Sequence, residues 1–371
     1  MANYTVAQYL DPATPKPFPV EEDVVLADLG LNIDALTPAQ FAELGRNNVD
    51  RIDATNNSLF LSTSRFEALG SVVLTAEDTV VLRDTGAELG TGTLEQIASL
   101  VPRNIDRIDA IDDVIPFSLA QLNTLQVPLT PGDVIVLTDH SSAIGALTPA
   151  QISSLASRGV VRIDATDNAF SWTQEQFAAL GGLALTASDV VLRLGTAGHD
   201  RMTGTPTEDG LDGGAGNDIL RSGDAAHVLK GGTGNDRLFG DRGNDQLWGN
   251  AGKDVMTGGR GKDAFVFDTK PNKKTNLDTV KDYNVRDDSV WLDNAIFKKL
   301  GGRGSVDSPA KINKAFFQVG ERADDRNDYL IYNKKTGILY YDADGSGGGR
   351  QVEIAKFSKN LKMSANDFFT I

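Results

Sequence analysis

The chain has 371 residues, which is enough for two or three domains and a large buried core. Its formal net charge of −15 argues against nucleic acid as a partner, because phosphate binding needs a basic surface. It contains no cysteine, which excludes disulfides and thiolate metal sites, and no apolar run approaches the length of a membrane span.

A helix-start motif recurs throughout residues 1–194. A Thr or Ser is followed three positions later by Gln or Arg, and then by apolar residues at helical spacing. The hydroxyl is placed to cap the helix, and the Gln completes a capping box. Ser62 is followed by Arg65, so this pair keeps only the cap half of the motif. The pairs are Thr5 with Gln8, Thr37 with Gln40, Ser62 with Arg65, Thr93 with Gln96, Ser118 with Gln121, Thr148 with Gln151 and Thr173 with Gln176.

Short strand patterns of two alternating types follow these helix starts. In the first type we expect the Ile to be buried and the Arg and Asp to pair between neighbouring coils. Strands that alternate with short helices favour parallel pairing, and the short repeat predicts an α/β solenoid of helix–strand units over residues 1–194. The first type comprises Arg51–Ala54, Arg107–Ala110 and Arg162–Ala165; the second comprises Val24–Leu26, Val80–Arg83, Val134–Leu137 and Val190–Arg193.

Motifs of familiar enzymes are missing from this half. The chain contains no H-E-x-x-H or G-x-S-x-G sequence, and its three histidines are His140, His199 and His227. We therefore expect no catalytic residues and a non-enzymatic binding or surface-associated role for residues 1–194. The many Asp and Glu side chains leave an extracellular glycan-acting enzyme as the alternative.

Residues 195–266 consist of nine residues repeated eight times without a gap. Position 6 of the repeat is Asp in seven units, and position 8 is apolar in all eight. The units begin at Gly195, Gly204, Gly213, Ser222, Gly231, Gly240, Gly249 and Gly258. The position-6 aspartates are Asp200, Asp209, Asp218, Asp236, Asp245, Asp254 and Asp263. The position-8 residues are Met202, Leu211, Leu220, Leu229, Leu238, Leu247, Met256 and Phe265.

The consensus G-G-x-G-x-D-x-U-x resembles the calcium-binding repeats of the RTX (repeats-in-toxin) family. The resemblance implies a calcium-binding parallel β-roll in which each ion lies between turns two units apart. Glycines permit the tight turn, and carboxylate and carbonyl oxygens are the ligands that Ca²⁺ prefers. The expected metal-binding residues are Asp200, Gly213, Gly216, Asp218, Gly231, Gly234, Asp236, Gly240, Gly243, Asp245, Gly249, Gly252, Asp254, Gly258, Gly261 and Asp263.

If turns two units apart stack, the position-6 residues form two columns. The odd column keeps every aspartate and offers about three sites between coils. The even column is damaged, because the fourth unit has His227 in place of Asp and has lost a glycine, so the Asp245 and Asp263 pair alone is expected to bind. We therefore expect about four calcium ions. The odd column is Asp200, Asp218, Asp236 and Asp254; the even column is Asp209, His227, Asp245 and Asp263.

Residues 267–371 differ in composition and are expected to form a β-rich cap. They contain thirteen lysines, whereas residues 1–194 contain one. Asp278–Tyr283 and Asp288–Leu292 resemble the strand pair that closes RTX rolls, and a cap is needed because the last coil otherwise exposes a strand edge. Asp342–Gly347 fits either a further calcium loop or a glycine-rich hairpin turn.

The chain end suggests a route out of the cell. Residues Asn366–Ile371 place an acidic side chain before apolar ones, which resembles the uncleaved type I secretion signal of RTX substrates. The alternative interpretation is an ordinary buried final strand. The first residues lack the features of a secretory signal peptide. The expected partners are calcium, the type I secretion machinery and a cell-surface or glycan ligand, and the expected location is extracellular or cell-surface associated.

Overall fold

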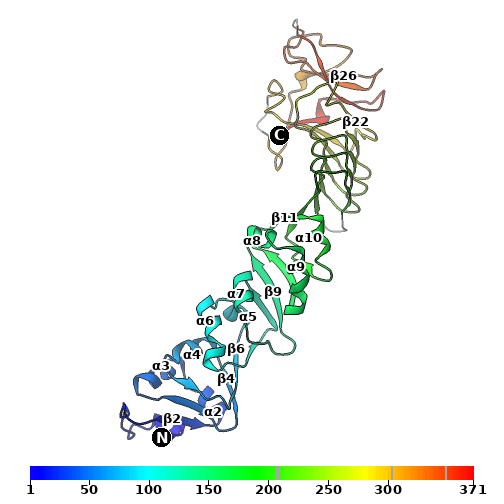
Figure 1. Ribbon diagram of the computed structural model, residues 1–371. Helices are drawn as coiled ribbons and strands as arrows, with labels where there is room; N and C mark the ends of the chain where they lie inside the picture. Colours follow the sequence, from blue (N-terminus) through cyan, green and yellow to red (C-terminus); the bar gives the residue numbers. More distant parts are fainter. Residues whose placement is uncertain (205–208, 302–303, 347–348) are drawn as a thin grey trace. The chain divides into compact units, whose positions relative to one another are not determined.

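The computed structural model describes residues 1–204, 209–301, 304–346 and 349–371, without the side chains of residues 170 and 209. This described part of the chain divides into two compact units (Figure 1). The N-terminal unit comprises Met1–Asn168 and Ala179–Asp189. The C-terminal unit comprises Ala169–Ala178 and Val190–Ile371. The division into segments 1–194, 195–266 and 267–371 stays a prediction.

Small parallel sheets form the N-terminal unit. Its described strands pair in the orders β1-β2-β3-β5, β4-β6-β7 and β12-β10-β9-β8, and all of these pairs are parallel. The strands are β1 (Ala2–Tyr4), β2 (Val24–Asp28), β3 (Arg51–Ala54), β4 (Ser58–Leu61), β5 (Val73–Leu74), β6 (Thr79–Asp84), β7 (Arg107–Ala110), β8 (Val114–Phe117), β9 (Val134–Asp139), β10 (Val160–Ala165) and β12 (Ala184–Leu185).

Short helices connect these strands, as parallel pairing requires. They bury one or two apolar residues each against the sheets; in α3 these are Phe41 and Leu44. The helices are α1 (Val6–Leu10), α2 (Gly30–Asp34), α3 (Pro38–Arg46), α4 (Thr63–Ala68), α5 (Gly86–Gly90), α6 (Leu94–Ser99), α7 (Leu119–Thr124), α8 (Ser141–Gly145) and α9 (Pro149–Leu155), with 3₁₀ turns at Val101–Arg103 and Ala156–Arg158. In the described residues no helix combines the length and apolarity that crossing a bilayer demands.

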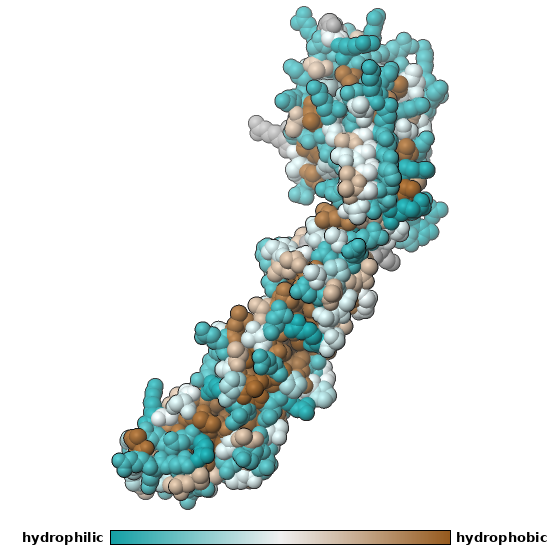
Figure 2. Space-filling model, viewed as in Figure 1, coloured by the Kyte–Doolittle hydropathy of each residue, from teal (hydrophilic) through white to brown (hydrophobic). Residues whose placement is uncertain are grey.

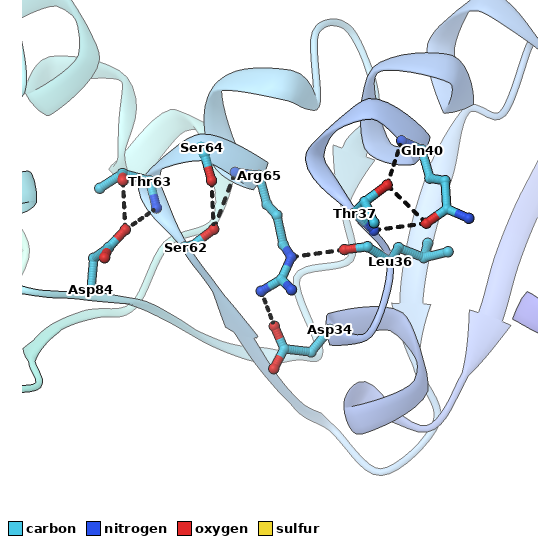
Figure 3. A network of polar contacts seen from close by, with 9 residues as sticks. All are labelled: Asp34, Leu36, Thr37, Gln40, Ser62, Thr63, Ser64, Arg65 and Asp84. Carbon is cyan, nitrogen blue, oxygen red and sulfur yellow. Dashed lines mark hydrogen bonds and ion pairs between the residues drawn. The ribbon is translucent and has the colours of Figure 1, made fainter.

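The predicted helix starts are confirmed at their capping atoms. At α3, the Thr37 hydroxyl accepts from the Gln40 amide, and Gln40 Oε1 accepts from the Thr37 amide at 2.8 Å (Figure 3). The same reciprocal pair is present at Thr5, Thr93, Ser118 and Thr148. Each box satisfies two backbone N–H groups that the first turn leaves unpaired, so it fixes where the helix begins.

The exceptional start at Ser62 uses its arginine differently. Ser62 accepts from the Arg65 amide, which is the cap half of the motif. The Arg65 guanidinium then donates back to the preceding helix layer, to the Leu36 carbonyl oxygen at 2.8 Å and to Asp34 at 2.8 Å (Figure 3). The residue that breaks the capping pattern therefore connects two successive helix–strand units.

The Arg-Ile-Asp-Ala strands behave as expected at their isoleucines. Ile52, Ile108 and Ile163 are all buried. The expected ion pairs between coils are present only in part: Arg83 of β6 pairs with Asp109 of β7 at 2.9 Å. Both side chains of this pair are partly exposed, so the pair contributes no more than ~1 kcal/mol.

Successive coils of this unit are joined by carboxylates that accept backbone N–H groups. The acceptor lies 20 to 26 residues after the donor, at 2.6 to 3.1 Å. This arrangement satisfies N–H groups at strand and helix starts that the parallel sheets leave unpaired. The donor and acceptor residues are Val6 and Asp28, Val24 and Asp50, Ala54 and Asp78, Thr63 and Asp84, Val80 and Asp106, Gly86 and Asp112, Leu119 and Asp139, and Ser141 and Asp167.

Asp78 is the most buried of these acceptors and gives a direct test. Its carboxylate accepts from the Ala54 amide at 2.9 Å and from the Thr75 hydroxyl at 2.6 Å. Asp78→Ala is expected to destabilise this unit by ~1–3 kcal/mol, because a buried N–H loses its acceptor. Glu77→Ala removes the same charge from an exposed neighbour and is expected to be nearly neutral. Urea unfolding by circular dichroism checks this, and identical curves for the two variants would contradict it.

Two long sheets dominate the C-terminal unit. Among the described residues the orders are β11-β13-β15-β17-β19-β21-β23-β29-β24 and β14-β16-β18-β20-β22-β28-β27-β26-β25. Through the repeats every pairing is parallel and joins strands 18 residues apart, so turns two units apart stack as predicted. Two long parallel sheets are consistent with a β-roll. The strands before and within the repeats are β11 (Ala169–Thr173), β13 (Val190–Leu194), β14 (Arg201–Thr203), β15 (Asp209–Asp212), β16 (Ile219–Arg221), β17 (Val228–Lys230), β18 (Arg237–Phe239), β19 (Gln246–Trp248), β20 (Val255–Thr257) and β21 (Ala264–Phe267), with helix α10 (Gln174–Ala178) after β11.

The core between the two sheets is built from position 8 of the repeat. Register places Met202, Leu220, Leu238 and Met256 on one sheet and the alternate units on the other. All eight position-8 side chains are buried, with at most 2 % of their surface exposed. Positions 7 and 9 lie on the opposite face of each strand, as its two-residue period requires. In the last unit these residues, Ala264 and Val266, are buried as well.

After the repeats, the two sheets continue and the chain then turns back on itself. Strand β22 extends one sheet and β23 the other, both in parallel register. The final strand β29 pairs with β23, and Phe368 is fully buried. The remaining strands are β22 (Asp278–Val280), β23 (Ser289–Leu292), β24 (Ala310–Lys311), β25 (Phe317–Val319), β26 (Leu330–Asn333), β27 (Ile338–Tyr341), β28 (Val352–Lys356) and β29 (Phe368–Thr370), with 3₁₀ turns at Lys314–Phe316 and Ala365–Asp367.

Candidate metal centre

The position-6 aspartates form two hydrogen-bonded ladders along the repeats. In the odd ladder the amide of Asp218 donates to Asp236 Oδ1 at 2.8 Å, and the amide of Asp236 donates to Asp254 Oδ1 at 2.8 Å. In the even ladder the amide of Asp245 donates to Asp263 Oδ1 at 3.0 Å. One carboxylate oxygen of each aspartate therefore accepts a hydrogen bond from an amide of the preceding coil. This bond fixes the direction in which the second carboxylate oxygen points.

That second oxygen is buried and unsatisfied. Each of these side chains has 1 % of its surface exposed. No donor reaches Oδ2 in the described residues, although a buried carboxylate oxygen without a partner costs several kcal/mol. The residues concerned are Asp218, Asp236, Asp245, Asp254 and Asp263.

The glycines bring backbone oxygens into the same space. At position 1, a Cβ added to Gly213 would lie 2.5 Å from Asp218 Oδ2, and one added to Gly240 would lie 2.7 Å from Asp245 Oδ2; Gly231, Gly249 and Gly258 are equivalent. At position 4, a Cβ added to Gly216, Gly234, Gly243, Gly252 or Gly261 would overlap the carbonyl oxygen of the residue 18 positions earlier. Each stacked turn is thus an oxygen-lined space with no room for a side chain.

The donor set fits a hard cation that is held largely by backbone. Calcium takes six to eight oxygens from carboxylates and carbonyls. Within the described chain no group of three carboxylate or imidazole side chains converges as in a site built from side chains alone. A cation between stacked turns would satisfy the unpaired Oδ2 atoms, and carbonyl oxygens would supply the remaining ligands.

Asp200, at the start of the odd ladder, does not share this geometry. Asp200 Oδ2 already accepts from the amide and the hydroxyl of Thr196, at 2.7 and 2.9 Å. The side chain of Asp209 lies outside the described residues. The first coil is therefore the least complete part of the odd ladder.

In the weak fourth unit, protein groups replace the missing ligands. The His227 ring lies at the position of the lost carboxylate, with Nδ1 2.6 Å from the Ala225 carbonyl oxygen and 3.8 Å from Asp245 Oδ1. The Ser222 hydroxyl donates to the Gly240 carbonyl oxygen. These contacts explain how the coil continues through a unit that lacks its aspartate.

Burial also changes the proton affinity of the ladder. It raises the pKa of Asp236 to about 6 and the pKa of Asp254 and Asp263 to about 7. Neighbouring carboxylates add to the effect, as Asp218 does for Asp236. Without a cation, the folded ladder therefore holds protons at pH values where an exposed aspartate is ionised.

These shifts predict a calcium requirement that depends on pH. The unfolded chain releases these protons near pH 3.8, so the calcium-free repeats lose stability as the pH rises from that value toward 7. A protonated ladder folds with less help from calcium, so the calcium concentration for half-folding should rise as the pH rises from about 5.5 to about 7.5. Calcium titrations followed by circular dichroism at both pH values check this; a constant midpoint would contradict it.

The structure adds ladder residues that the sequence reasoning missed. The amide of Asp254 donates to Asp278 Oδ1 at 3.0 Å, and the amide of Asp263 donates to Asp288 Oδ1 at 3.1 Å. Their spacing is 24 and 25 residues, so they fall outside the nine-residue phase. The signal was present in Asp278-Thr279-Val280 and Asp288-Ser289-Val290, which repeat the D-x-U part of the consensus.

Comparison with known proteins agrees with this geometry. The profile of the RTX calcium-binding nonapeptide repeat matches residues 194–225 and 230–264 in four copies. The chain carries RTX calcium-binding nonapeptide repeats. RTX repeats bind Ca²⁺ and are typical of secreted proteins, so this part of the chain is a calcium-binding module of the hemolysin type.

Two solved structures are similar at low identity. The AlgE6R3 subunit of the Azotobacter vinelandii mannuronan C5-epimerase is 19 % identical, over 47 % of this chain and 79 % of that one, with a TM-score of 0.27. The extracellular lipase LipA from Serratia marcescens is 12 % identical, over 90 % of this chain and 69 % of that one, with a TM-score of 0.19. No curated protein sequence gives a significant match.

The loop that begins at Asp342 remains an open prediction as a further calcium site. It connects the antiparallel strands β27 and β28, and Asp342 Oδ1 accepts from the Asp344 amide at 3.3 Å. Gly345 has φ +65°, which is typical of a tight turn. Gly347 lies outside the described residues.

Proposed function

We propose that this protein is exported through a type I system and folds on calcium outside the cell, as a secreted or cell-surface-associated protein. The observation that carries the proposal is the row of buried, unpartnered Oδ2 atoms in the aspartate ladders. At low calcium, ionised carboxylates in this row repel one another with no cation between them. An unfolded chain of this kind can pass through a narrow export channel.

The energy of the transition is supplied by the ions. Glycine-rich turns have little apolar surface to offset the entropy of ordering their backbone. Each site adds ~1.4 kcal/mol when calcium exceeds its Kd tenfold, and four sites together add ~5 kcal/mol. Millimolar extracellular calcium lies in the range that extracellular modules bind.

We assign about four ions to the two ladders. Three lie between coils of the odd ladder and one lies between Asp245 and Asp263 of the even ladder. The ligands are the aspartates at position 6 and the turns that contain glycines 1 and 4, which are the residues predicted from the repeat. Equilibrium dialysis at saturating calcium counts the ions, and a count of one or none would contradict the assignment.

For the rest of the chain we propose an N-terminal α/β solenoid and a C-terminal β-rich cap. The solenoid repeats the helix–strand unit through three sheets, and its carboxylates join successive coils. The cap adds β22, β23 and β29 to the ends of the two repeat sheets, which covers the last coil.

The N-terminal unit is proposed to be a non-enzymatic binding surface. Hydrophobic residues are visible along it in Figure 2. Leu31 and Ile111 have 73 % and 60 % of their surface exposed, and such residues support contact with a cell-surface partner. A screen of glycans and lipid vesicles with the full chain tests the proposal. Loss of binding in a variant that carries both Leu31→Ser and Ile111→Ser supports it, and unchanged binding contradicts it.

A glycan-acting enzyme is the second candidate, and one cavity favours it. This cavity, of about 130 Å³, is lined by Glu67 and Glu88 and by apolar side chains that include Phe66 and Phe117. Two carboxylates on one cavity are the groups that glycoside chemistry uses. Turnover of a polysaccharide by the full chain, abolished in Glu67→Gln, would establish this candidate in place of the binding role.

Export is tested separately from folding. Removal of residues 366–371 in cells that carry a type I exporter is expected to keep the chain inside the cell. Val290→Asp disrupts β23, the partner strand of β29, but keeps the terminal sequence. The Val290→Asp variant is therefore expected to be exported. If both this variant and the truncated chain stay inside the cell, the C-terminal sequence is not the export signal.

A further inference from the structure

The residue before each capping Thr or Ser of residues 1–194 is large and apolar at every helix start but one. Before α3 and α9 it is Leu36 and Leu147, which have 1 % and 3 % of their surface exposed. In a hydrophobic staple, such a residue packs against the fourth residue of the helix that follows. Before α6 this position is Gly92, so the staple residue is missing there. The other residues at this position are Tyr4, Leu61, Phe117 and Trp172.

The backbone at Gly92 does not require glycine. Its φ is not positive, so an L side chain can adopt this conformation. A Cβ added to Gly92 would lie 3.4 Å from the Leu89 carbonyl oxygen and 3.6 Å from Ile97 Cγ1, which are ordinary contacts. Ile97 is the fourth residue of α6 and hence the expected partner of a staple residue. The missing side chain therefore leaves space beside Ile97.

A cavity of about 130 Å³ lies at this place, and Gly92 and Ile97 both line it. All its apolar side chains, among them Phe66 and Phe117, have at most 6 % of their surface exposed. An apolar cavity of about 150 Å³ stays dry and takes up one molecule of the size of benzene. The cavity therefore fits one aromatic ring or branched alkyl group, whereas a sugar ring would leave hydroxyl groups unpaired among these side chains.

The charged side chains that line this cavity are both negative. They are Glu67 and Glu88, and the lining contains no lysine, arginine or histidine. Both are exposed, so they lie where the cavity meets solvent. Glu67 accepts from the Gln96 side chain at 2.6 Å, which leaves its charge in place, and within the described residues neither carboxylate forms an ion pair. Arg103 lies over the Phe66 ring, 4.2 Å from its centroid, but does not line the cavity.

We propose that this cavity binds a small organic amine. The aromatic ring or branched alkyl group of the amine occupies the space of the missing staple residue, and its ammonium group lies next to the Glu67 and Glu88 carboxylates. An ammonium group is the donor that such carboxylates recognise. The site involves neither Leu31 nor Ile111, so it goes beyond the binding surface proposed above and is tested separately from it.

The test is a ligand-observed NMR titration of the full chain with 2-phenylethylamine, at neutral pH and saturating calcium. Neutral 2-phenylethanol and anionic 3-phenylpropanoate carry the same ring and serve as probes of charge. The amine is expected to bind with a Kd of about 1 mM, which is reasonable for a ligand of this size. The alcohol should bind several-fold more weakly, and the carboxylate should show no measurable binding.

Gly92→Leu tests the cavity while it keeps every charge of the chain. It restores the residue found at Leu36 and Leu147, so it is expected to abolish measurable binding without lowering the urea midpoint of the N-terminal unit. The matched control is Gly182→Leu, which adds the same side chain where a Cβ meets no atom within 4 Å. This control should bind the amine as the parent chain does.

A variant that carries both Glu67→Gln and Glu88→Gln tests the carboxylates. It is expected to weaken amine binding about tenfold and to leave 2-phenylethanol binding unchanged, since each exposed carboxylate contributes a factor of up to about five. Its control carries Glu77→Gln and Glu95→Gln, two exposed carboxylates outside the lining. Parent affinity in Gly92→Leu, equal weakening in the two double variants, alcohol binding as tight as amine binding, or no binding at about 10 mM amine would each overturn the proposal.

Discussion

Replacement of Gly234 by alanine is expected to prevent calcium-dependent folding of the repeats. Gly234 has φ +131°, which an L side chain rarely adopts, and its added Cβ would overlap the carbonyl oxygen of Gly216. The turn cannot move aside, because the Gly234 amide donates to the Ala251 carbonyl oxygen at 2.8 Å. Backbone strain and overlap each cost ~1–3 kcal/mol, which together approach the ~5 kcal/mol that four ions supply.

The control for this substitution is Gly182→Ala in the N-terminal unit. A Cβ at Gly182 would meet no atom within 4 Å, so the variant should fold as the parent chain does. Far-UV circular dichroism at millimolar calcium compares the two variants. A Gly234→Ala chain with the parent spectrum and the parent calcium midpoint would show that the turns are looser than the stacked geometry requires.

Asp236→Ala is expected to have the second largest effect. The substitution removes the acceptor of a buried amide, that of Asp218, at a cost of ~1–3 kcal/mol. It also removes an Oδ2 atom from the middle of the odd ladder, where coils stack on both sides. The calcium concentration for half-folding should rise about tenfold or more, since ~1.4 kcal/mol corresponds to a factor of ten.

Asp224→Ala separates this effect from the loss of charge alone. Asp224 lies in the same repeat region, and 68 % of its side chain is exposed in a pair with Arg242. Its replacement should leave the calcium midpoint within about twofold, because exposed pairs contribute little. Equal shifts in the two variants would mean that the ladder position of Asp236 has no special role.

The elements with strict spacing were predictable from sequence. Position 8 of the repeat is apolar in every unit, and this alone predicts the core from Met202 to Phe265. The capping boxes were predictable because Thr37 and Gln40, for example, contact each other three residues apart. In both cases the interacting residues are separated in sequence by a fixed number of positions, which is three in the capping boxes and a multiple of nine in the repeats.

Contacts with irregular spacing were not predictable in the same way. The N-terminal carboxylates accept hydrogen bonds from amides that lie 20 to 26 residues earlier in the sequence. Because this separation varies, no repeat period identifies Asp78 as the acceptor for the Ala54 amide. An insertion moves Asp278 and Asp288 out of the repeat phase while it leaves them on the ladders. Gln246 and Phe369 belong to the same sheet, and only the strand order brings β19 and β29 into it.

Native-state amide hydrogen exchange of the full chain, with calcium and with chelator, tests the central claim most directly. With calcium, amides in residues 195–266 such as those of Asp218, Asp236 and Asp254 should be protected. With chelator at neutral pH these amides should exchange at nearly unfolded rates, while those of Ile52 and Ile163 in the N-terminal unit stay protected. Equal protection of the repeats in both conditions would contradict the coupling of calcium binding to folding.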